Sequence, residues 1–413
     1  MLDRHIFGSA LRRACLATGV LLMFAAHAAA QPAAAAPWTE IVVQSSTIGP
    51  RTIRVATPAE YARGTDRYAL LVMFDAEDRP MLRLAIAQTA YLRANGDGVP
   101  AMIVVGIVNG QDRIHDMTPT PTGSSVAAFK TAGGASAFAD FVLRDVLPAV
   151  RARYRTLPTT ILAGHSAGGL FALDMAATRP RSANGVVAMD PAIWFNDGAP
   201  ARLYADAIAR SPAGTRVFVG YGGLESDIDA ATTEFSRRLE EAKSSTVAFA
   251  SRRYPDDSHA LVPLAALPDG LRFVFAPLSL QRLPIAKLAE GVDAAAVMAA
   301  LATSEAQYSD TARSLHLPEA LPETALERAA RFAMNTLKND DLVVRILERN
   351  IALHPGSARA GARLADGYAA KGDVAAAIAQ LRRAIALDRS SATELPADAR
   401  TKLRELERKT SRK

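Results

Sequence analysis

Strand-like apolar runs alternate with helical stretches from residue 38 to about residue 280. The first two runs alternate apolar and polar residues, as half-exposed antiparallel strands do, whereas the middle runs are continuously apolar, as in a parallel sheet covered on both faces. We expect strands at 39–45, 51–57, 69–74, 102–108, 159–163, 185–189, 216–220 and 246–253, and helices at 80–94, 135–153, 167–178 and 228–243. This alternation predicts an α/β fold with a doubly wound, mostly parallel sheet.

A proline-bearing break at 277–284 separates this region from a tail rich in Ala, Leu and Arg, without strand-like runs. A shift of 34 residues places Leu347 under Leu381 and Ile351 under Ile385. That period is typical of tetratricopeptide helix pairs. We expect an all-α tetratricopeptide-like region at 285–395, followed by a charged tail at 396–413. A generic Ala-rich helical bundle is the alternative.

The N-terminus has the pattern of a secretory signal peptide. Arg4, Arg12 and Arg13 precede an apolar run at 14–26, and Ala28-Ala29-Ala30 fits a cleavage site. We expect cleavage after residue 30 and export to the periplasm or beyond, with an uncleaved membrane tether as the alternative. The chain's single cysteine, Cys15, leaves with this segment. A thiol nucleophile, a disulfide and a cysteine metal site are thereby excluded from the mature chain.

The formal net charge of +6 is modest, and without a clustered basic patch it gives no argument for nucleic-acid binding. After cleavage of the signal peptide, we expect no stable membrane span.

The segment Gly164-His165-Ser166-Ala167-Gly168 has the G-x-S-x-G pattern of a nucleophile elbow. A strand is predicted before it and a helix after it, which is the context that such an elbow requires. Side chains at 164 or 168 would collide with the neighbouring strand or helix, so glycine is expected there. Ser166 would then project above the carboxyl ends of the strands, where α/β folds bind ligands.

A serine nucleophile needs a general base, and elimination among the seven histidines leaves His259. His5 and His27 lie in the signal peptide, His115 precedes the serine, His316 and His354 lie in the helical tail, and His165 is expected to point away from the nucleophile. His259 follows the last strand-like run, so the chain order serine, acid, histidine matches that of α/β-hydrolases.

The acid that orients this histidine should follow a later strand. Glu225, after the run at 216–220, is our choice, with Asp227 as the alternative; we expect Asp256 and Asp257 to cap the following helix instead. The oxyanion hole should combine the N–H of Ala167 with an N–H from the loop at 75–78.

The elbow GHSAGGLFAL resembles that of the esterase D and enterochelin-esterase group of the α/β-hydrolase superfamily. Further segments that resemble this group, in the same order, are LVMFDA at 71–76, RIHDMTP at 113–119, FVLRDVLPAVRARY at 141–154, MDPAIWF at 189–195, GGLE at 222–225 and DSH at 257–259. The resemblance covers about residues 38–280, and a helical tetratricopeptide-like extension also occurs in the group. Met189-Asp190 departs from the group's serine-led pattern, which puts the polarity of the pocket in doubt.

The resemblance implies Ser166, Glu225 and His259 as the catalytic triad, although a serine–histidine dyad occurs among siderophore esterases. It implies that the N–H of Glu77 joins that of Ala167 in the oxyanion hole. Trp194 would wall the substrate pocket, unless it is an ordinary core residue. Arg113 and Asp116 would line the entrance, or else form an ion pair that fixes a long loop.

These observations predict an exported serine hydrolase that cleaves small carboxylic esters, siderophore esters among them, through an acyl-enzyme and without a metal or cofactor. An acyltransferase on the same fold is one alternative. The other is a binding protein whose hydrolase region is inactive and whose tetratricopeptide-like tail holds a protein partner.

Overall fold

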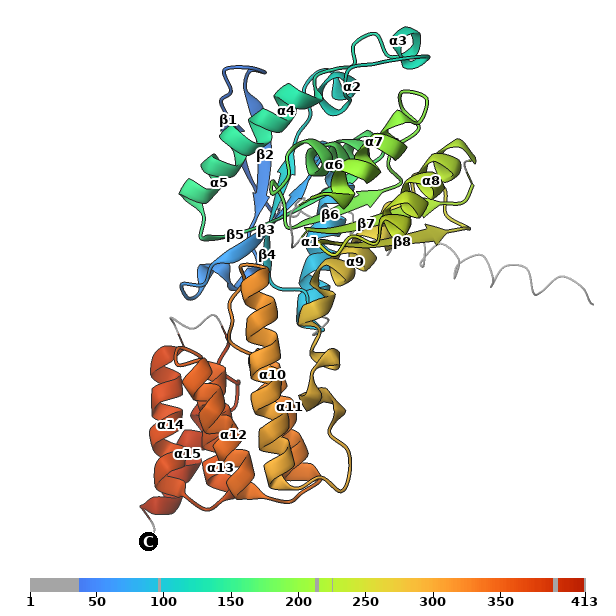
Figure 1. The fold of residues 1–413 in the computed structure, drawn as a ribbon. Coiled ribbons are helices and arrows are strands. Elements are labelled where there is room, and N and C mark those ends of the chain that lie inside the picture. Colours follow the sequence, from blue (N-terminus) through green and yellow to red (C-terminus); the bar gives the residue numbers. More distant parts are fainter. Residues whose placement is uncertain (1–36, 96–97, 212–214, 225, 389–392, 412–413) are drawn as a thin grey trace, which may run out of the picture. The chain divides into compact units, whose positions relative to one another are not determined.

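The computed structural model describes residues 37–95, 98–211, 215–224, 226–388 and 393–411 (Figure 1). Its centre is an eight-stranded sheet with the order β1-β2-β4-β3-β5-β6-β7-β8. The strands are β1 (Thr39–Val43), β2 (Arg51–Ala56), β3 (Tyr68–Met73), β4 (Met102–Ile107), β5 (Thr156–His165), β6 (Gly185–Met189), β7 (Thr215–Gly222) and β8 (Val247–Tyr254). Each strand overlaps one of the eight predicted runs.

The direction of the strands also agrees with the sequence pattern. β2 pairs antiparallel with both β1 and β4, and Glu40 lies opposite Arg54 in the β1–β2 register. The pairings from β4 through β3, β5, β6 and β7 to β8 are all parallel. Every residue of β3, β4 and β6 is buried, as parallel strands covered on both faces require. The predicted mostly parallel α/β sheet is confirmed.

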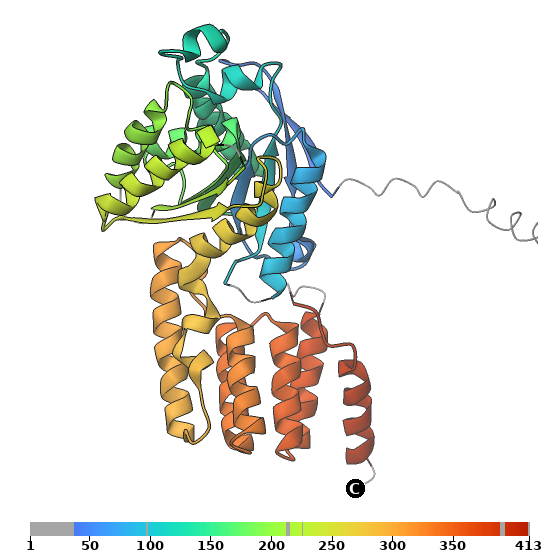
Figure 2. The same ribbon diagram turned by 90° about the vertical axis from the view of Figure 1, so that its right-hand side faces the viewer.

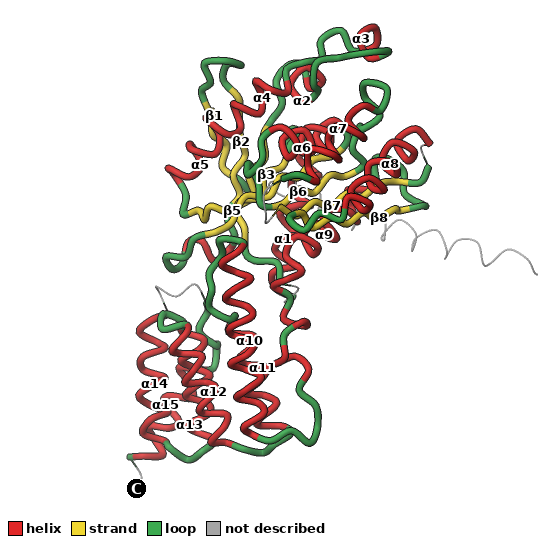
Figure 3. Tube along the Cα trace, in the orientation of Figure 1, coloured by secondary structure: helices red, strands yellow, loops and turns green. Residues whose placement is uncertain are grey.

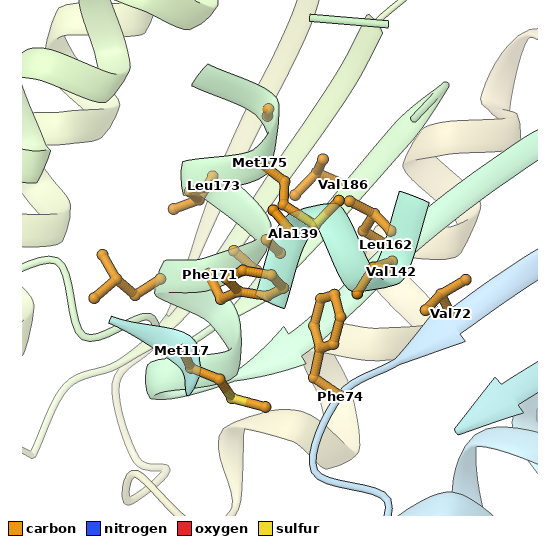
Figure 4. Close-up of a cluster of buried hydrophobic side chains, with 14 of the residues drawn as sticks. Val72, Phe74, Met117, Ala139, Val142, Leu162, Phe171, Leu173, Met175 and Val186 are labelled. Atoms are coloured by element: carbon orange, nitrogen blue, oxygen red, sulfur yellow. The ribbon is translucent and has the colours of Figure 1, made fainter. Parts of the chain in front are cut away.

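Alternate side chains of β3 enter two different hydrophobic cores, because successive strand residues point to opposite faces of a sheet. Leu70 and Val72 belong to one core, and Leu71 and Met73 belong to the other. Figure 4 shows the first core, in which Phe74 packs against Phe171 with 4.9 Å between the ring centroids. Helices therefore cover both faces of the sheet.

The first core includes residues of α4 (Ala135–Phe141), the π-helical turn η2 (Val142–Val146), α5 (Leu147–Arg153), α6 (Ala167–Thr178), α7 (Ala199–Ala209) and α8 (Ser226–Ala242). The second core includes residues of α1 (Arg79–Ala94) and α9 (Val262–Phe275). The short helices α2 (Arg113–Met117) and α3 (Ser125–Ala128) lie in the long connection after β4, and a 3-10 turn η1 (Ala59–Ala62) follows β2.

Helices and turns make up the described chain beyond β8 (Figure 3). After α9 come three 3-10 turns, η3 (Ala276–Leu278), η4 (Leu280–Arg282) and η5 (Pro284–Lys287). The helices that follow are α10 (Ala294–Ser314), α11 (Glu323–Asn335), α12 (Asp340–Leu353), α13 (Ala358–Ala370), α14 (Val374–Leu387) and α15 (Ala399–Thr410). Figure 2 shows them side by side, and α11 packs on α12 as α13 packs on α14.

Two of these helices repeat at the predicted period, since α12 begins at Asp340 and α14 begins 34 residues later at Val374. The helical C-terminal region is confirmed, while its tetratricopeptide-like nature stays a prediction. The charged tail is mostly the helix α15, whose Ala399 is buried beside Leu381. The predicted signal peptide at 1–30 lies outside the described residues, and within them no helix is long and apolar enough to cross a membrane.

Candidate active site

Ser166 occupies a strained turn between β5 and α6. Its φ of 59° and ψ of −120° lie outside the regions that L-residues favour. The Ser166 N–H donates to the Met189 carbonyl at 3.0 Å, and the Ser166 carbonyl accepts from the N–H groups of Leu170 and Ala192. These three hydrogen bonds attach the strained residue to β6 and to its own helix, so the surrounding backbone holds the conformation in place.

The glycines of the elbow lie where an added Cβ would come too close to a neighbouring atom, a backbone atom at Gly164 and a side-chain atom at Gly168. A Cβ at position 164 would lie 2.2 Å from the carbonyl oxygen of Gly168, and a Cβ at position 168 would lie 2.8 Å from Oδ2 of Asp75. Both distances are far below van der Waals contact. The predicted collision with the helix matches the structure at Gly164, whereas the close atom at Gly168 belongs to Asp75 in the loop after β3.

His259 lies in the turn between β8 and α9, and its ring is fixed by a buried carboxylate. The Nδ1 atom is 2.7 Å from Oδ2 of Asp190, whose side chain is 2% exposed. The other carboxylate oxygen accepts from the N–H of Gly222 at 2.9 Å. A carboxylate on Nδ1 favours the tautomer with the proton on Nδ1, which leaves Nε2 free to accept a proton.

Asp190 was not among the acids that the sequence analysis named. It follows β6, with a φ of 45°, and its N–H donates to the Gly220 carbonyl at 2.7 Å. Glu225 lies outside the described residues, and Asp227 falls in the first turn of α8. The signal available in the sequence was the Met189-Asp190 departure from the resembled pattern, which placed a carboxylate directly at the end of a buried strand.

His165 lies against His259, contrary to the expectation that it points away. The two ring centroids are 4.3 Å apart, and Nε2 of His165 is 2.8 Å from the carbonyl oxygen of His259. Burial, together with the neighbouring His259, lowers the pKa of His165 to about 4. His165 is therefore neutral near pH 7. Because it directly precedes Ser166 in the chain, its contact with His259 connects the elbow to the candidate base.

The loop between β3 and α1 carries a free N–H next to two that are used. The Ala76 N–H donates to the Ile107 carbonyl at 3.0 Å, and the Asp78 N–H donates to the Asp75 carbonyl at 3.1 Å. The Glu77 N–H has no hydrogen-bond partner among the residues that the structure describes. Ala167 is the first residue of α6, so its N–H has no partner within the helix either. These are the two donors expected for an oxyanion hole.

Arg113 holds this loop through the side chain of Asp75. Its guanidinium makes a bidentate pair with Asp75, at 2.5 and 2.8 Å, and donates to the His165 carbonyl at 3.2 Å. The loop-fixing ion pair suggested for Arg113 therefore exists, but its partner is Asp75. Asp116 instead contacts Arg51 at 3.4 Å. Asp256 and Asp257 do not cap α9, which has no side-chain cap.

A cavity of about 240 Å³ opens at this end of the sheet. Its lining residues are Met73, Phe74, Asp75, Glu77, Asp78, Met81, Arg113, His165 and Met189. Arg113 lines this cavity, and its role at the entrance for a substrate stays a prediction. Trp194 is not among these lining residues; it is 36% exposed and packs against Phe129, with 5.9 Å between ring centroids.

Residues 45–260 match the model of the family described as "Putative esterase". The chain belongs to this esterase family. Over 159 residues it is 31% identical to the siderophore triacetylfusarinine C esterase of Aspergillus fumigatus, an alignment that covers 36% of this chain. The chain spans about half the length of that curated relative, namely 53% of it. The family and this relative support carboxylic ester hydrolysis.

Solved structures show the same fold. An IroE-like serine hydrolase from Shewanella oneidensis matches with a TM-score of 0.60 and 20% identity, over 76% of this chain and 98% of its own. An uncharacterised protein from Capnocytophaga ochracea matches with a TM-score of 0.58 and 16% identity, over 90% of this chain and 99% of its own. The second match extends beyond the family region, so it includes part of the helical C-terminal region.

Proposed function

We propose that this esterase-family chain is a serine hydrolase that cleaves carboxylic esters through an acyl-enzyme on Ser166. The observation that carries the proposal is the His259–Asp190 pair, whose histidine contacts His165, the residue before a serine in a strained elbow conformation. In the proposed reaction, Nε2 of His259 takes the Ser166 proton as Oγ attacks the ester carbonyl carbon. The same proton then passes to the leaving alkoxide, which departs as the alcohol.

Water then hydrolyses the acyl-enzyme with the help of the same residues. Water gives a proton to His259 and its oxygen attacks the acyl carbon, and the proton then returns to Ser166 as the carboxylic acid leaves. Asp190 stabilises the imidazolium that forms in both halves of the reaction. The N–H groups of Ala167 and Glu77 would receive the oxyanion of each tetrahedral intermediate, and one such donor is typically worth about 3 kcal/mol.

Covalent labelling with a fluorophosphonate tests the nucleophile. We expect stoichiometric labelling of the wild-type chain, mapped to Ser166 by peptide mass spectrometry, and no labelling of Ser166→Ala. Ser182→Ala is the matched control, because Ser182 lies in the turn after α6 and should leave labelling unchanged. If Ser166→Ala is labelled as fast as the wild type, the proposed function is wrong.

The proposed substrates are small esters, including those of siderophores. The support is the likeness to the fungal siderophore esterase and a cavity large enough for a small acyl group. A panel of chromogenic acyl esters, assayed beside an ester-linked hydroxamate siderophore and a catecholate trilactone, would rank these classes by kcat/KM. A rate for both siderophores far below that for simple acyl esters would argue against the siderophore class.

Export and partner binding also belong to this proposal. The pattern of residues 1–30 supports cleavage after Ala30, which N-terminal sequencing of the mature protein would test. The 34-residue spacing of α12 and α14 supports a tetratricopeptide-like surface for a protein partner. Cross-links from the full chain to a second protein should fall within residues 285–395, and cross-links confined to residues 38–280 would argue against that role.

A further inference from the structure

The buried side chain of Arg54, on β2, contacts the loop at 75–78 that carries the candidate oxyanion donor Glu77. The Arg54 side chain is 7% exposed, and its Nη1 donates a hydrogen bond to the carbonyl oxygen of Ala76. Its Nε donates to Glu40 Oε1, on the neighbouring strand β1, at 2.9 Å. The guanidinium also lies over the ring of Trp38, 5.5 Å from the ring centroid. A permanently charged group is thus fixed on one side of a single peptide unit.

That peptide unit is the one that carries the candidate oxyanion donor. The carbonyl of Ala76 and the N–H of Glu77 belong to the same planar peptide group, and in a trans peptide they point in opposite directions. A hydrogen bond that fixes the direction of the Ala76 carbonyl therefore also fixes the direction of the Glu77 N–H. Arg54 can orient this donor without touching the substrate.

The loop side chains of Asp75 and Glu77 are held by Arg113 and Asn109, but the carbonyl of this peptide is held by Arg54. Within the described residues, Arg54 is the one hydrogen-bond donor to the Ala76 carbonyl. The loop begins at Asp75, whose φ of 60° is in the left-handed region that costs a non-glycine residue energy. A loop with such a residue tends to relax unless other contacts hold it, and the contact at Ala76 is charge-assisted and buried, which makes it stronger than a neutral one.

The charge also acts on the donor itself. A cation at the carbonyl oxygen draws electron density through the peptide group, which makes the N–H at the other end a stronger hydrogen-bond donor. Its positive potential also favours the negative oxygen that develops in the transition state, and the effect is larger in a buried site than in water. Glu40 offsets this charge only in part, because its side chain is 51% exposed and screened by solvent.

We propose that Arg54 is a positioning residue for catalysis, which orients and polarises the Ala76–Glu77 peptide so that its N–H stabilises the oxyanion. The inference rests on the proposed function, since it takes the Glu77 N–H as a donor to the tetrahedral intermediate. It assigns to β2, on the antiparallel side of the sheet, a part in a site otherwise built from the parallel strands.

Arg54→Met and Arg54→Lys test the proposal, with Arg216→Met as the matched control. Arg216 is also a partly buried strand arginine that donates to a main-chain carbonyl, that of Phe273 at 3.1 Å, and it does not line the cavity beside Glu77 and His165. The readouts are kcat, KM and the affinity of a boronic acid that forms a tetrahedral anion on the serine. Thermal unfolding gives the folded fraction of each variant.

We expect Arg54→Met to lose on the order of 100-fold in kcat and a similar factor in boronate affinity, with KM changed by no more than about threefold, because the donor acts mainly in the transition state. Arg54→Lys should lose several-fold in kcat, because a single ammonium cannot donate to Glu40 and to the Ala76 carbonyl with the planar geometry of a guanidinium. Arg216→Met should keep the wild-type kcat and boronate affinity even if it unfolds at a lower temperature.

The inference is overturned if folded Arg54→Met keeps wild-type kcat and boronate affinity, or if it loses no more than Arg216→Met. Where Arg54→Met does not fold, Arg54→Lys decides, and an unchanged kcat in that variant overturns the inference. Fluorophosphonate titration of the wild type separates this result from a failure of the proposed function. If Ser166 of the wild type is not labelled, both the proposed function and the inference about Arg54 are wrong. If the wild type is labelled and the Arg54 variants keep full activity, only the inference is wrong.

Discussion

Oδ2 of Asp190 lies 2.7 Å from Nδ1 of His259, and the aspartate follows β6, whereas the acid predicted from the sequence follows β7. The carboxylate is buried and accepts a second hydrogen bond from the Gly222 N–H, at the end of β7. Asp190 thus connects the ends of two adjacent parallel strands with the turn that carries the candidate base.

Asp190→Asn should reduce kcat by roughly 10³-fold or more, because an amide in place of the carboxylate favours the wrong imidazole tautomer and cannot stabilise the imidazolium. The measurement is kcat for a chromogenic ester between pH 6 and 9. Glu225→Gln is the paired variant, and we expect it to stay close to wild type. A larger loss in Glu225→Gln than in Asp190→Asn would restore Glu225 as the acid.

Replacing Ser166 by glycine should stabilise the fold while abolishing activity. The φ of 59° costs serine about 1 kcal/mol or more, and glycine adopts a positive φ freely. Urea unfolding should therefore give a higher midpoint for Ser166→Gly than for Ser166→Ala, which keeps the strain. At Ser182, which does not have a positive φ, the same pair of variants should show no such gain. Equal midpoints for the two Ser166 variants would contradict the strain.

Gly164→Ala should disrupt the elbow. The added methyl group would lie 2.2 Å from the Gly168 carbonyl oxygen, a backbone atom that can move only with α6. We expect a loss of about 3 kcal/mol or more in the free energy of unfolding, together with slower fluorophosphonate labelling. Gly356→Ala is the control, because a Cβ there meets no atom within 4 Å. An unchanged free energy of unfolding in Gly164→Ala would show that the elbow relaxes more easily than this contact indicates.

His165 should make stability fall at mildly acidic pH. Its pKa is about 4 in the folded chain, below the ordinary value of 6.5, so the unfolded chain binds a proton first as the pH drops. Stability is therefore highest above about pH 6.5, and it should fall between pH 6.5 and pH 4 with a slope of up to about 1.4 kcal/mol per pH unit from this group.

Urea unfolding of His165→Asn at pH 7 and pH 5 measures that contribution. The asparagine variant should lose less stability between the two pH values than the wild type, even if it is less stable at pH 7. His316→Asn is the control, because His316 is exposed and its φ of 54° is one that asparagine tolerates. An unchanged pH dependence in His165→Asn would mean that His165 does not carry the effect.

The sequence by itself determined the sheet and pointed to the candidate nucleophile. Apolar runs such as those of β3 and β4 are local signals, since a strand buried on both faces must be apolar at every position. The elbow around Ser166 was equally readable, because its G-x-S-x-G pattern is local and a Cβ at Gly164 would meet Gly168 four residues along the chain. His259 could be reached by elimination, since one chain holds few histidines.

The tertiary structure alone decided which groups surround these two residues. Asp190, His165 and Arg54 each contact a residue far away in the sequence, and the local pattern around each one does not identify that partner. A carboxylate after β6 and one after β7 are equivalent in sequence pattern. Which of them meets His259 depends on how adjacent strand ends and the β8–α9 turn come together in space, and that is set by the packing of the whole sheet.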